Sequence, residues 1–136
     1  MVKSEIFSTI SAICGSCLAC VFGGWDKVIE CLVICIAIDY ITGIMSAYAT
    51  KSLSSAVGFK GFLKKVLIFA IVAVAATLDK AIGNPDMLFR TATCFFYIAN
   101  EGLSILENAS KLGIPLPQKL EDALIQLQDD NSKKGE

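Results

Sequence analysis

Apolar residues are gathered into four stretches along the chain, separated by short segments rich in polar residues, glycine or proline. The stretches run over 6–24, 28–50, 66–82 and 88–106. The third is short, and we expect its helix to start earlier, near Phe62. Each is close to the roughly 20 residues that a helix needs to cross the hydrocarbon core of a bilayer. Because backbone polar groups in lipid must be satisfied within their own segment, we interpret all four as helices. The pattern predicts an all-α integral membrane helical bundle, in one domain, with three to four transmembrane helices.

The composition agrees with a membrane location. Hydrophobic residues make up 54% of the 136 residues and charged residues 18%. A soluble chain of this length leaves much of its surface in water and has little interior in which to bury so many apolar side chains. The chain also lacks histidine and a glycine-rich phosphate-binding loop, so we expect neither an enzyme nor a bound cofactor.

The segment 51–65, between the second and third stretches, is basic. It has no acidic residue and carries four lysines: Lys51, Lys60, Lys64 and Lys65. Lysine and arginine accumulate in cytoplasmic loops beside spans, so we place this segment at the inner leaflet, and four spans then leave both termini cytoplasmic. Phe59 and Phe62 alternate with the lysines and favour a short interfacial helix, with a merely solvated basic loop as the alternative.

Four charged residues lie at the opposite, outer ends of the predicted spans. They are Glu30, Asp79, Lys80 and Arg90. On this topology the four share one depth, where they can pair with one another or reach the lipid headgroups. We interpret them as a set of charges that anchors the outer face.

Other polar residues lie near the middle of the predicted spans, with Asp39 in the second and Asn100 and Glu101 in the fourth. A charged residue at the centre of a span costs roughly 2.5–3.5 kcal/mol on insertion scales, so each needs a partner or access to water. Helical spacing extends these positions into two polar stripes. The stripes are Asp39, Thr42, Ser46 and Thr50 on one helix and Arg90, Thr93, Tyr97, Asn100, Glu101, Ser104 and Asn108 on the other. They either hydrogen-bond to one another inside the bundle or line water in an assembled form, and the pattern favours neither.

Small residues lie beside the Asp39 stripe. Gly43 and Ala47 form a small-xxx-small pair, which lets another helix approach closely. Such pairs are common in membrane helices, but together with the polar stripes this pair predicts an oligomer.

Three of the six cysteines, Cys14, Cys17 and Cys20, repeat every three residues inside the first predicted span. No histidine is present to complete a zinc set, and cysteine is itself a small apolar residue. We therefore expect no metal site and no disulfide. Nucleic-acid binding is not expected either, because the formal net charge is −1 and the lysines lie beside spans, where anionic lipid is the nearer partner.

The tail, 107–136, contains a further periodic segment. Pro115 and Pro117 end the fourth stretch, and Leu120, Leu124 and Leu127 then recur at helical spacing. We predict a short amphipathic cytoplasmic helix followed by a disordered, charged end. The apolar stripe of this helix can dock on the bundle, on the membrane surface or on neighbouring tails.

Three motifs in the chain are more specific than its composition. They are the D-Y-x-T-G run at Asp39, Tyr40, Thr42 and Gly43, the G-F-K-G-x-x-K-K sequence that ends the basic segment, and Y-I-A-N-E-G-L-S-I-L-E-N at 97–108 followed by L-G-I-P-x-P. In these blocks, across about 39–127, the chain resembles the phage holins of the group that includes the clostridial toxin-release holin.

The resemblance implies a protein that oligomerises in the bacterial cytoplasmic membrane and forms lesions that release an endolysin, or in some relatives a large toxin. The released protein need not bind the chain directly. We hypothesise that Asp39, Asn100 and Glu101 are hidden against one another in the early bundle and face water in the lesion, with Gly43 and Ala47 at helix contacts. Composition alone leaves an alternative, a small four-span transporter or ion channel subunit that uses a midplane carboxylate.

Overall fold

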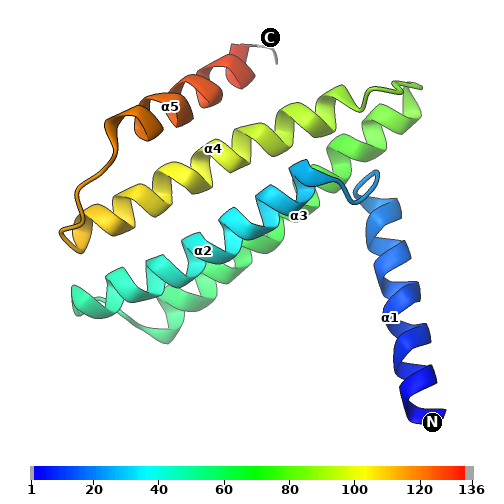
Figure 1. The fold of residues 1–136 in the computed structure, drawn as a ribbon, viewed down its shortest axis with the longest axis horizontal. Helices are drawn as coiled ribbons and strands as arrows, with labels where there is room; N and C mark the ends of the chain where they lie inside the picture. Colours follow the sequence, from blue (N-terminus) through cyan, green and yellow to red (C-terminus); the bar gives the residue numbers. More distant parts are fainter. Residues whose placement is uncertain (1, 134–136) are drawn as a thin grey trace.

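The computed structural model describes residues 2–133, which fold into five α-helices joined by short turns (Figure 1). The helices are α1 (Val2–Val21), α2 (Lys27–Ala49), α3 (Ser55–Ala81), α4 (Leu88–Lys111) and α5 (Gln118–Lys133). The predicted all-α fold is confirmed. Within the described residues, α1, α2 and α3 are the three helices long and apolar enough to cross a membrane, which is the lower end of the predicted range.

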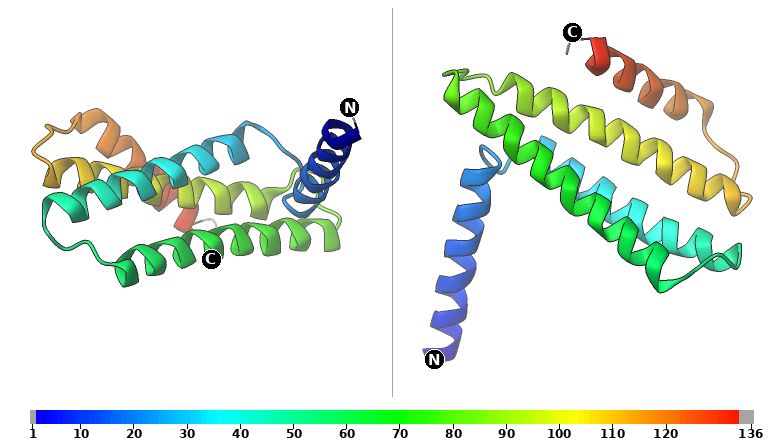
Figure 2. Two further views of the ribbon diagram at one scale, coloured as in Figure 1. Left: turned by 90° about the horizontal axis from the view of Figure 1, so that it is seen from below. Right: turned by 180° about the vertical axis from the view of Figure 1, so that it is seen from behind.

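Helix α4 lies at the centre of the arrangement. It packs against α2 and α3 on one side and against α5 on the other, so the molecule is layered (Figures 1 and 2). Helix α1 stands away from this bundle and touches only the end of α3. None of the residues of α1 is buried, so in the single chain the apolar side chains along most of this helix are not covered by protein.

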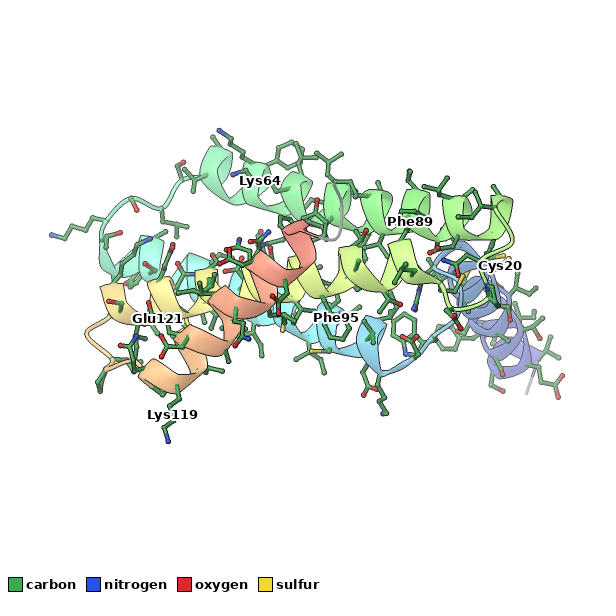
Figure 3. All side chains as sticks on the ribbon, turned by 90° about the horizontal axis from the view of Figure 1, so that it is seen from above. Cys20, Lys64, Phe89, Phe95, Lys119 and Glu121 are labelled. Carbon is green, nitrogen blue, oxygen red and sulfur yellow. The ribbon has the colours of Figure 1, made fainter. Side chains whose placement is uncertain are left out.

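The apolar core lies between α2, α3 and α4, whose side chains are drawn in Figure 3. Its buried members are Ile29, Leu32, Ile36, Ile68, Val72, Cys94 and Ile98. Phe95 and other partly buried side chains pack around them. This core holds the three helices together beside the polar residues described below.

The start of α3 differs from the sequence-based expectation. That expectation has the third span begin between Phe62 and residue 66, after a basic interfacial loop over 51–65, whereas the helix begins at Ser55. The side chain of Ser54 accepts a hydrogen bond from the backbone N–H of Val57 at 3.2 Å and so caps the helix. The interfacial helix expected around Phe59 is therefore the first part of α3, because no helix-breaking residue separates the two.

Helix α4 also runs past its expected end at residue 106 and stops at Lys111. The chain then turns at Gly113, whose φ of +79° is readily adopted only by glycine. Two prolines follow, and α5 begins at Gln118, as the tail pattern predicts. Of the three docking sites open to its apolar stripe, α5 uses the bundle. The disordered end expected for the tail lies in 134–136, outside the described residues.

Candidate functional site

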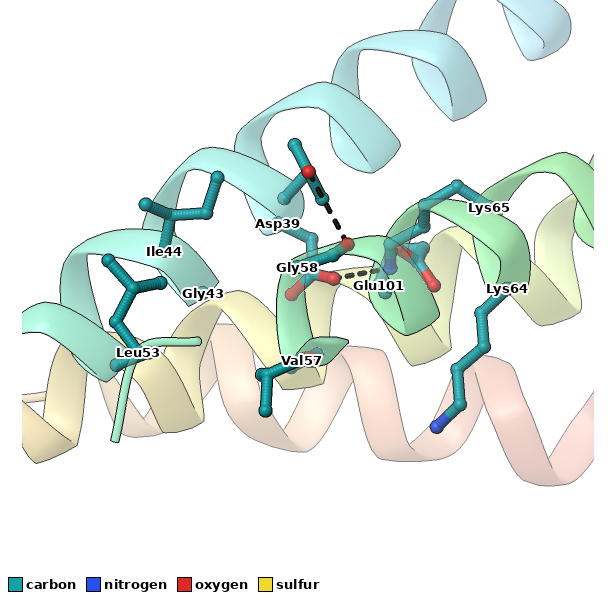
Figure 4. Close-up of a pocket in the computed structure, with 13 residues that line it drawn as sticks. Asp39, Gly43, Ile44, Leu53, Val57, Gly58, Lys64, Lys65 and Glu101 are labelled. Atoms are coloured by element: carbon teal, nitrogen blue, oxygen red, sulfur yellow. Dashed lines mark hydrogen bonds and ion pairs between the residues drawn. The ribbon is translucent and has the colours of Figure 1, made fainter. Parts of the chain in front are cut away.

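The polar residues at mid-helix come together in what we call the central cluster, formed by Asp39, Lys65, Glu101 and Asn108. The Nζ atom of Lys65 contacts Asp39 Oδ2 and Glu101 Oε2, so one ammonium lies between two carboxylates (Figure 4). Asn108 Nδ2 donates to Asp39 Oδ1 at 3.2 Å. The cluster therefore joins α2, α3 and α4 through side chains alone.

Burial makes these contacts necessary. The side chains of Asp39 and Glu101 are each 8% exposed and that of Lys65 is 16% exposed. A buried charge that lost its partner would incur a large desolvation cost without the Coulombic attraction that offsets it. The cluster holds two acidic groups and one basic group, so Lys65 is the residue on which the burial of both carboxylates depends.

Neighbouring positions on α2 extend the cluster. Thr42 accepts a hydrogen bond from Asn108 Nδ2 at 3.2 Å, and its hydroxyl donates back to the carbonyl oxygen of Ile38 at 2.9 Å. Ser46, one turn further on, is buried. Asp39 and Thr42 of the predicted stripe thus bond to α4 and Ser46 is buried, whereas Thr50, at the end of the stripe, is exposed.

The position of Lys65 differs from the expectation that it contacts the inner leaflet. Because α3 begins at Ser55, Lys65 lies well inside a helix, on the side that faces α2 and α4. The other three lysines of the basic segment, Lys51, Lys60 and Lys64, are exposed. The sequence pattern did not identify this contact, because Lys65 lies 26 and 36 residues along the chain from its two acidic partners.

A cavity of about 360 Å³ adjoins the central cluster, between α2, α3 and α4 (Figure 4). Small residues from two helices line it: Gly43, Ala47, Gly58 and Gly61. Tyr40 spans the gap with a hydrogen bond of 3.4 Å from its hydroxyl to the carbonyl oxygen of Gly58. Ser104 also lines this space. Gly43 and Ala47, the predicted helix-packing pair, therefore face a partly filled space within the single chain.

Asn100 and Tyr97, both on the α4 stripe, have other partners than the central cluster. Asn100 points toward α5, where its side-chain oxygen accepts a hydrogen bond from Gln128 Nε2. The ring of Tyr97 packs edge-on against Phe96, with centroids 5.3 Å apart, and borders the apolar core. The stripe thus divides between two faces of α4, because residues 100 and 101 are successive positions that point in different directions.

A second polar site, which we call the turn cluster, lies at one end of the bundle and consists of Asp26, Asp79 and Arg90. Asp79 is completely buried and accepts hydrogen bonds from the backbone N–H groups of Phe89 at 3.1 Å and Arg90 at 2.8 Å. The residue before α4, Met87, provides no side-chain cap. Asp79 therefore caps α4 from the end of the neighbouring helix, satisfying N–H groups that have no partner within α4.

Arg90 uses its side chain to hold the turn between α1 and α2. Its Nη1 and Nη2 donate to the two carboxylate oxygens of Asp26 at 2.9 and 3.0 Å, and Nη2 also donates to the carbonyl oxygen of Gly24 at 3.2 Å. The hydrogen bond from Arg90 lowers the pKa of the exposed, loop-borne Asp26. Gly23, in the same turn, has a φ of +75°, a left-handed backbone conformation that glycine adopts without strain.

The four charges expected to pair at the outer face have mostly other partners. Glu30 pairs with Lys27 at 2.7 Å, and Lys80 donates to the carbonyl oxygen of Cys20. Asp79 bonds to the backbone of Arg90, while the Arg90 side chain bonds to Asp26. In the single chain the four side chains thus do not form ion pairs with one another, and their anchoring role at the outer face stays a prediction.

The family model of the bacteriophage holins matches residues 16–129, which include both clusters. The chain belongs to the bacteriophage holin family. This is a family of non-enzymatic membrane proteins, in agreement with the apolar helices α1 to α3. No solved structure matches this holin-family chain.

Relatives of this holin-family chain occur in bacteria and in a phage. The chain is 37% identical over 113 residues to a probable holin of Bacillus phage phi105, covering 83% of each chain. It is 43% identical over 120 residues to an uncharacterized 14.9 kDa protein in the nagH 3' region of Clostridium perfringens, covering 88% of this chain and 89% of that relative. An uncharacterized protein of Listeria monocytogenes, Lmo0128, is 38% identical over 111 residues, covering 82% of this chain and 79% of that relative.

Proposed function

We propose that this chain oligomerises in the bacterial cytoplasmic membrane and forms lesions through which an endolysin, or a large toxin, leaves the cytoplasm. The observation that carries the proposal is the central cluster, in which Lys65 lies between two carboxylates at mid-helix in a chain of the holin family. Its partners are other copies of the same chain and membrane lipids. The released protein passes through the lesion and need not bind the chain directly.

The chemistry of the cluster suggests how one chain supports two states. In the single chain the charges of Asp39, Lys65 and Glu101 are satisfied by one another, so they can stay away from water. Side-chain contacts between helices break when the helices rotate or separate, and water in a lesion would then solvate the freed charges. Assembly thus converts a self-contained polar interior into a wetted surface.

The residues that face water in this assembled state are those of the two stripes. We assign to this surface Asp39, Thr42, Ser46, Tyr97, Asn100, Glu101 and Ser104. Gly43 and Ala47, which line the cavity beside the central cluster, are then free to receive a neighbouring helix.

The lysines set the proposed orientation. Lys51, Lys60 and Lys64 are exposed and contact the inner leaflet, which places the loop between α2 and α3 on the cytoplasmic side. The N-terminus of α1 and the turn between α4 and α5 lie on the same side. The turn cluster, which joins the other two turns, lies at the outer face.

The proposal is tested by expressing the chain alone in bacteria that also hold a cytosolic muralytic enzyme. Membrane potential and wall degradation are recorded together. An abrupt collapse of the potential after a delay, followed promptly by wall degradation, is the expected result. Collapse without enzyme escape would replace the large lesion with a small ion pore, and an intact potential would favour a transporter.

A further inference from the structure

We infer that α5 faces the water-filled interior of the lesion at membrane depth, and so forms part of its wall. The inference rests on the proposed function and deepens it. It also changes the position expected for the tail, which the sequence pattern placed in the cytoplasm.

The first observation is depth. After the turn at Gly113, α5 runs back beside α4 (Figure 1). Leu124 packs on Gly102, where an added Cβ would lie 2.9 Å from Leu124 Cδ2, and Gln128 donates to Asn100. Asn100 and Gly102 flank Glu101 in the sequence, so α5 reaches the level of the central cluster. With 16 residues it is about 24 Å long, most of the roughly 30 Å hydrocarbon thickness.

The second observation is sidedness. Among the described residues α5 packs on α4 and on no other helix, while α2 and α3 cover the opposite side of α4 (Figure 2). The outer surface of α2 and α3 is apolar, with exposed side chains such as Ile41 and Val74. The outer surface of α5 is largely polar. Its exposed polar residues include Lys119, Asp122, Gln126 and Asp129.

These two observations leave one low-energy placement. A charged side chain that faced lipid at this depth would cost roughly 2.5–3.5 kcal/mol near the bilayer centre, and α5 carries several. The apolar surface of α2 and α3 faces lipid without such a cost. The molecule is therefore arranged with α2 and α3 toward lipid and α5 toward water, and only an aqueous lumen supplies water there.

The cytoplasmic alternative requires α5 to leave α4. That departure would strip Asn100 of its hydrogen bond to Gln128 and open the close contact at Gly102. Asn100 would then depend on lumen water for a hydrogen bond, and Gly102 would lose the side chain that packs on it. Docked α5 satisfies them within the same chain, which favours the lumen position.

The test uses the purified full chain in planar bilayers and a bulky, water-soluble polyethylene glycol maleimide. In a background with all six cysteines replaced by serine, Asp122→Cys places one thiol on the outer face of α5. Adding the reagent to open lesions should reduce the current several-fold, because the attached polymer occupies the lumen. Current that is unchanged after mass spectrometry confirms modification of Asp122→Cys overturns the inference.

Two matched variants give the comparison its meaning. Ser52→Cys, at an exposed position in the loop between α2 and α3, should be modified with no loss of current, and Val74→Cys should resist modification because lipid covers it. A current fall for Ser52→Cys equal to that for Asp122→Cys also overturns the inference. If the cysteine-free chain is inactive, Asp122→Cys is introduced into the native chain instead. Its loss of current is then compared with that of the unsubstituted native chain treated with the same reagent. A native chain that produces no current overturns the proposed function itself.

Discussion

The central cluster and the turn cluster both contain buried charged side chains, yet they are built differently. In the turn cluster, Asp79 bonds to backbone N–H groups and Arg90 bonds partly to backbone carbonyl oxygens. In the central cluster, Lys65, Asp39 and Glu101 bond to one another's side chains. The first arrangement fixes the course of the chain, whereas the second fixes only how three helices face one another.

This difference indicates which cluster can change during assembly. Opening the turn cluster would leave helix-end backbone groups without partners, which is costly in any environment without water. Opening the central cluster requires only that its side chains find water or new partners. We therefore expect the turn cluster to persist in the lesion and the central cluster to be remodelled.

The largest effect should come from Lys65→Met, which removes the one cation between two buried carboxylates. Breaking a buried pair in this way destabilises proteins by about 3–5 kcal/mol. The free energy of unfolding in detergent should fall by that order. Lys64→Met is the matched control, since Lys64 is adjacent and exposed, and should change little. Equal stability of the two variants would show that the central cluster does not stabilise the fold.

A smaller loss of stability is expected for Asp79→Ala. The variant removes the cap of α4 and leaves the buried N–H of Arg90 and the partly buried N–H of Phe89 without their partner, at a cost of about 1–3 kcal/mol. Thermal unfolding in detergent measures the loss. At matched protein level in the membrane, the delay before lysis should stay close to that of the native chain. A strong change in that delay would show that the turn cluster also takes part in assembly.

Asp39→Asn tests the central cluster by removing one of its negative charges instead of its positive charge. The amide keeps a hydrogen-bonding side chain but removes one negative charge, so the cluster retains one ion pair, Lys65 with Glu101, and should lose less stability than in Lys65→Met. The onset of lysis should nevertheless shift, because the variant alters the balance between the closed and the wetted state. Asp39→Leu should shift it as well. Unchanged timing in both variants would exclude Asp39 from the proposed mechanism.

The smallest effect concerns pH and Asp26. Its pKa is lowered in the folded chain, so its ionised form stabilises the fold at neutral pH. This contribution is complete above the ordinary aspartate pKa of about 3.9 and is lost as the pH falls through the lower folded value. The effect is small because the Asp26 side chain is 51% exposed. Unfolding temperatures measured across this acidic range should fall less steeply for Asp26→Asn than for the native chain.

Much of the secondary structure could be predicted from the chain because the determining signals are local. Apolar runs of span length marked α1 and α2, and the prolines with the leucine spacing marked α5. The continuity of α3 from Ser55 was not predicted, because the basic residues of 51–65 were assigned to a separate interfacial segment, although lysine is a good helix former. The cap at Ser54 was recognised only in the structure.

The candidate site was predictable only in part. Asp39 and Glu101 were recognised because a carboxylate in an apolar span is unusual, and Asn108 was already on the predicted stripe. Lys65 was assigned elsewhere, since its distance from both acids in the sequence gives no sign of contact. Asn100 and Glu101 bond to different helices, Asn100 to α5 and Glu101 to α3. This difference depends on where α5 lies, which helical spacing alone does not specify.

A helical membrane protein with carboxylates at mid-span could be predicted from the chain alone, because the length and hydrophobicity of each segment are local properties. Three contacts became known only from the folded structure: Lys65 joins Asp39 to Glu101, Asp79 caps another helix, and α5 lies along α4. Those contacts join residues far apart in the chain. Their formation depends on helix packing as a whole, which fixes the depth and the facing side of each polar group.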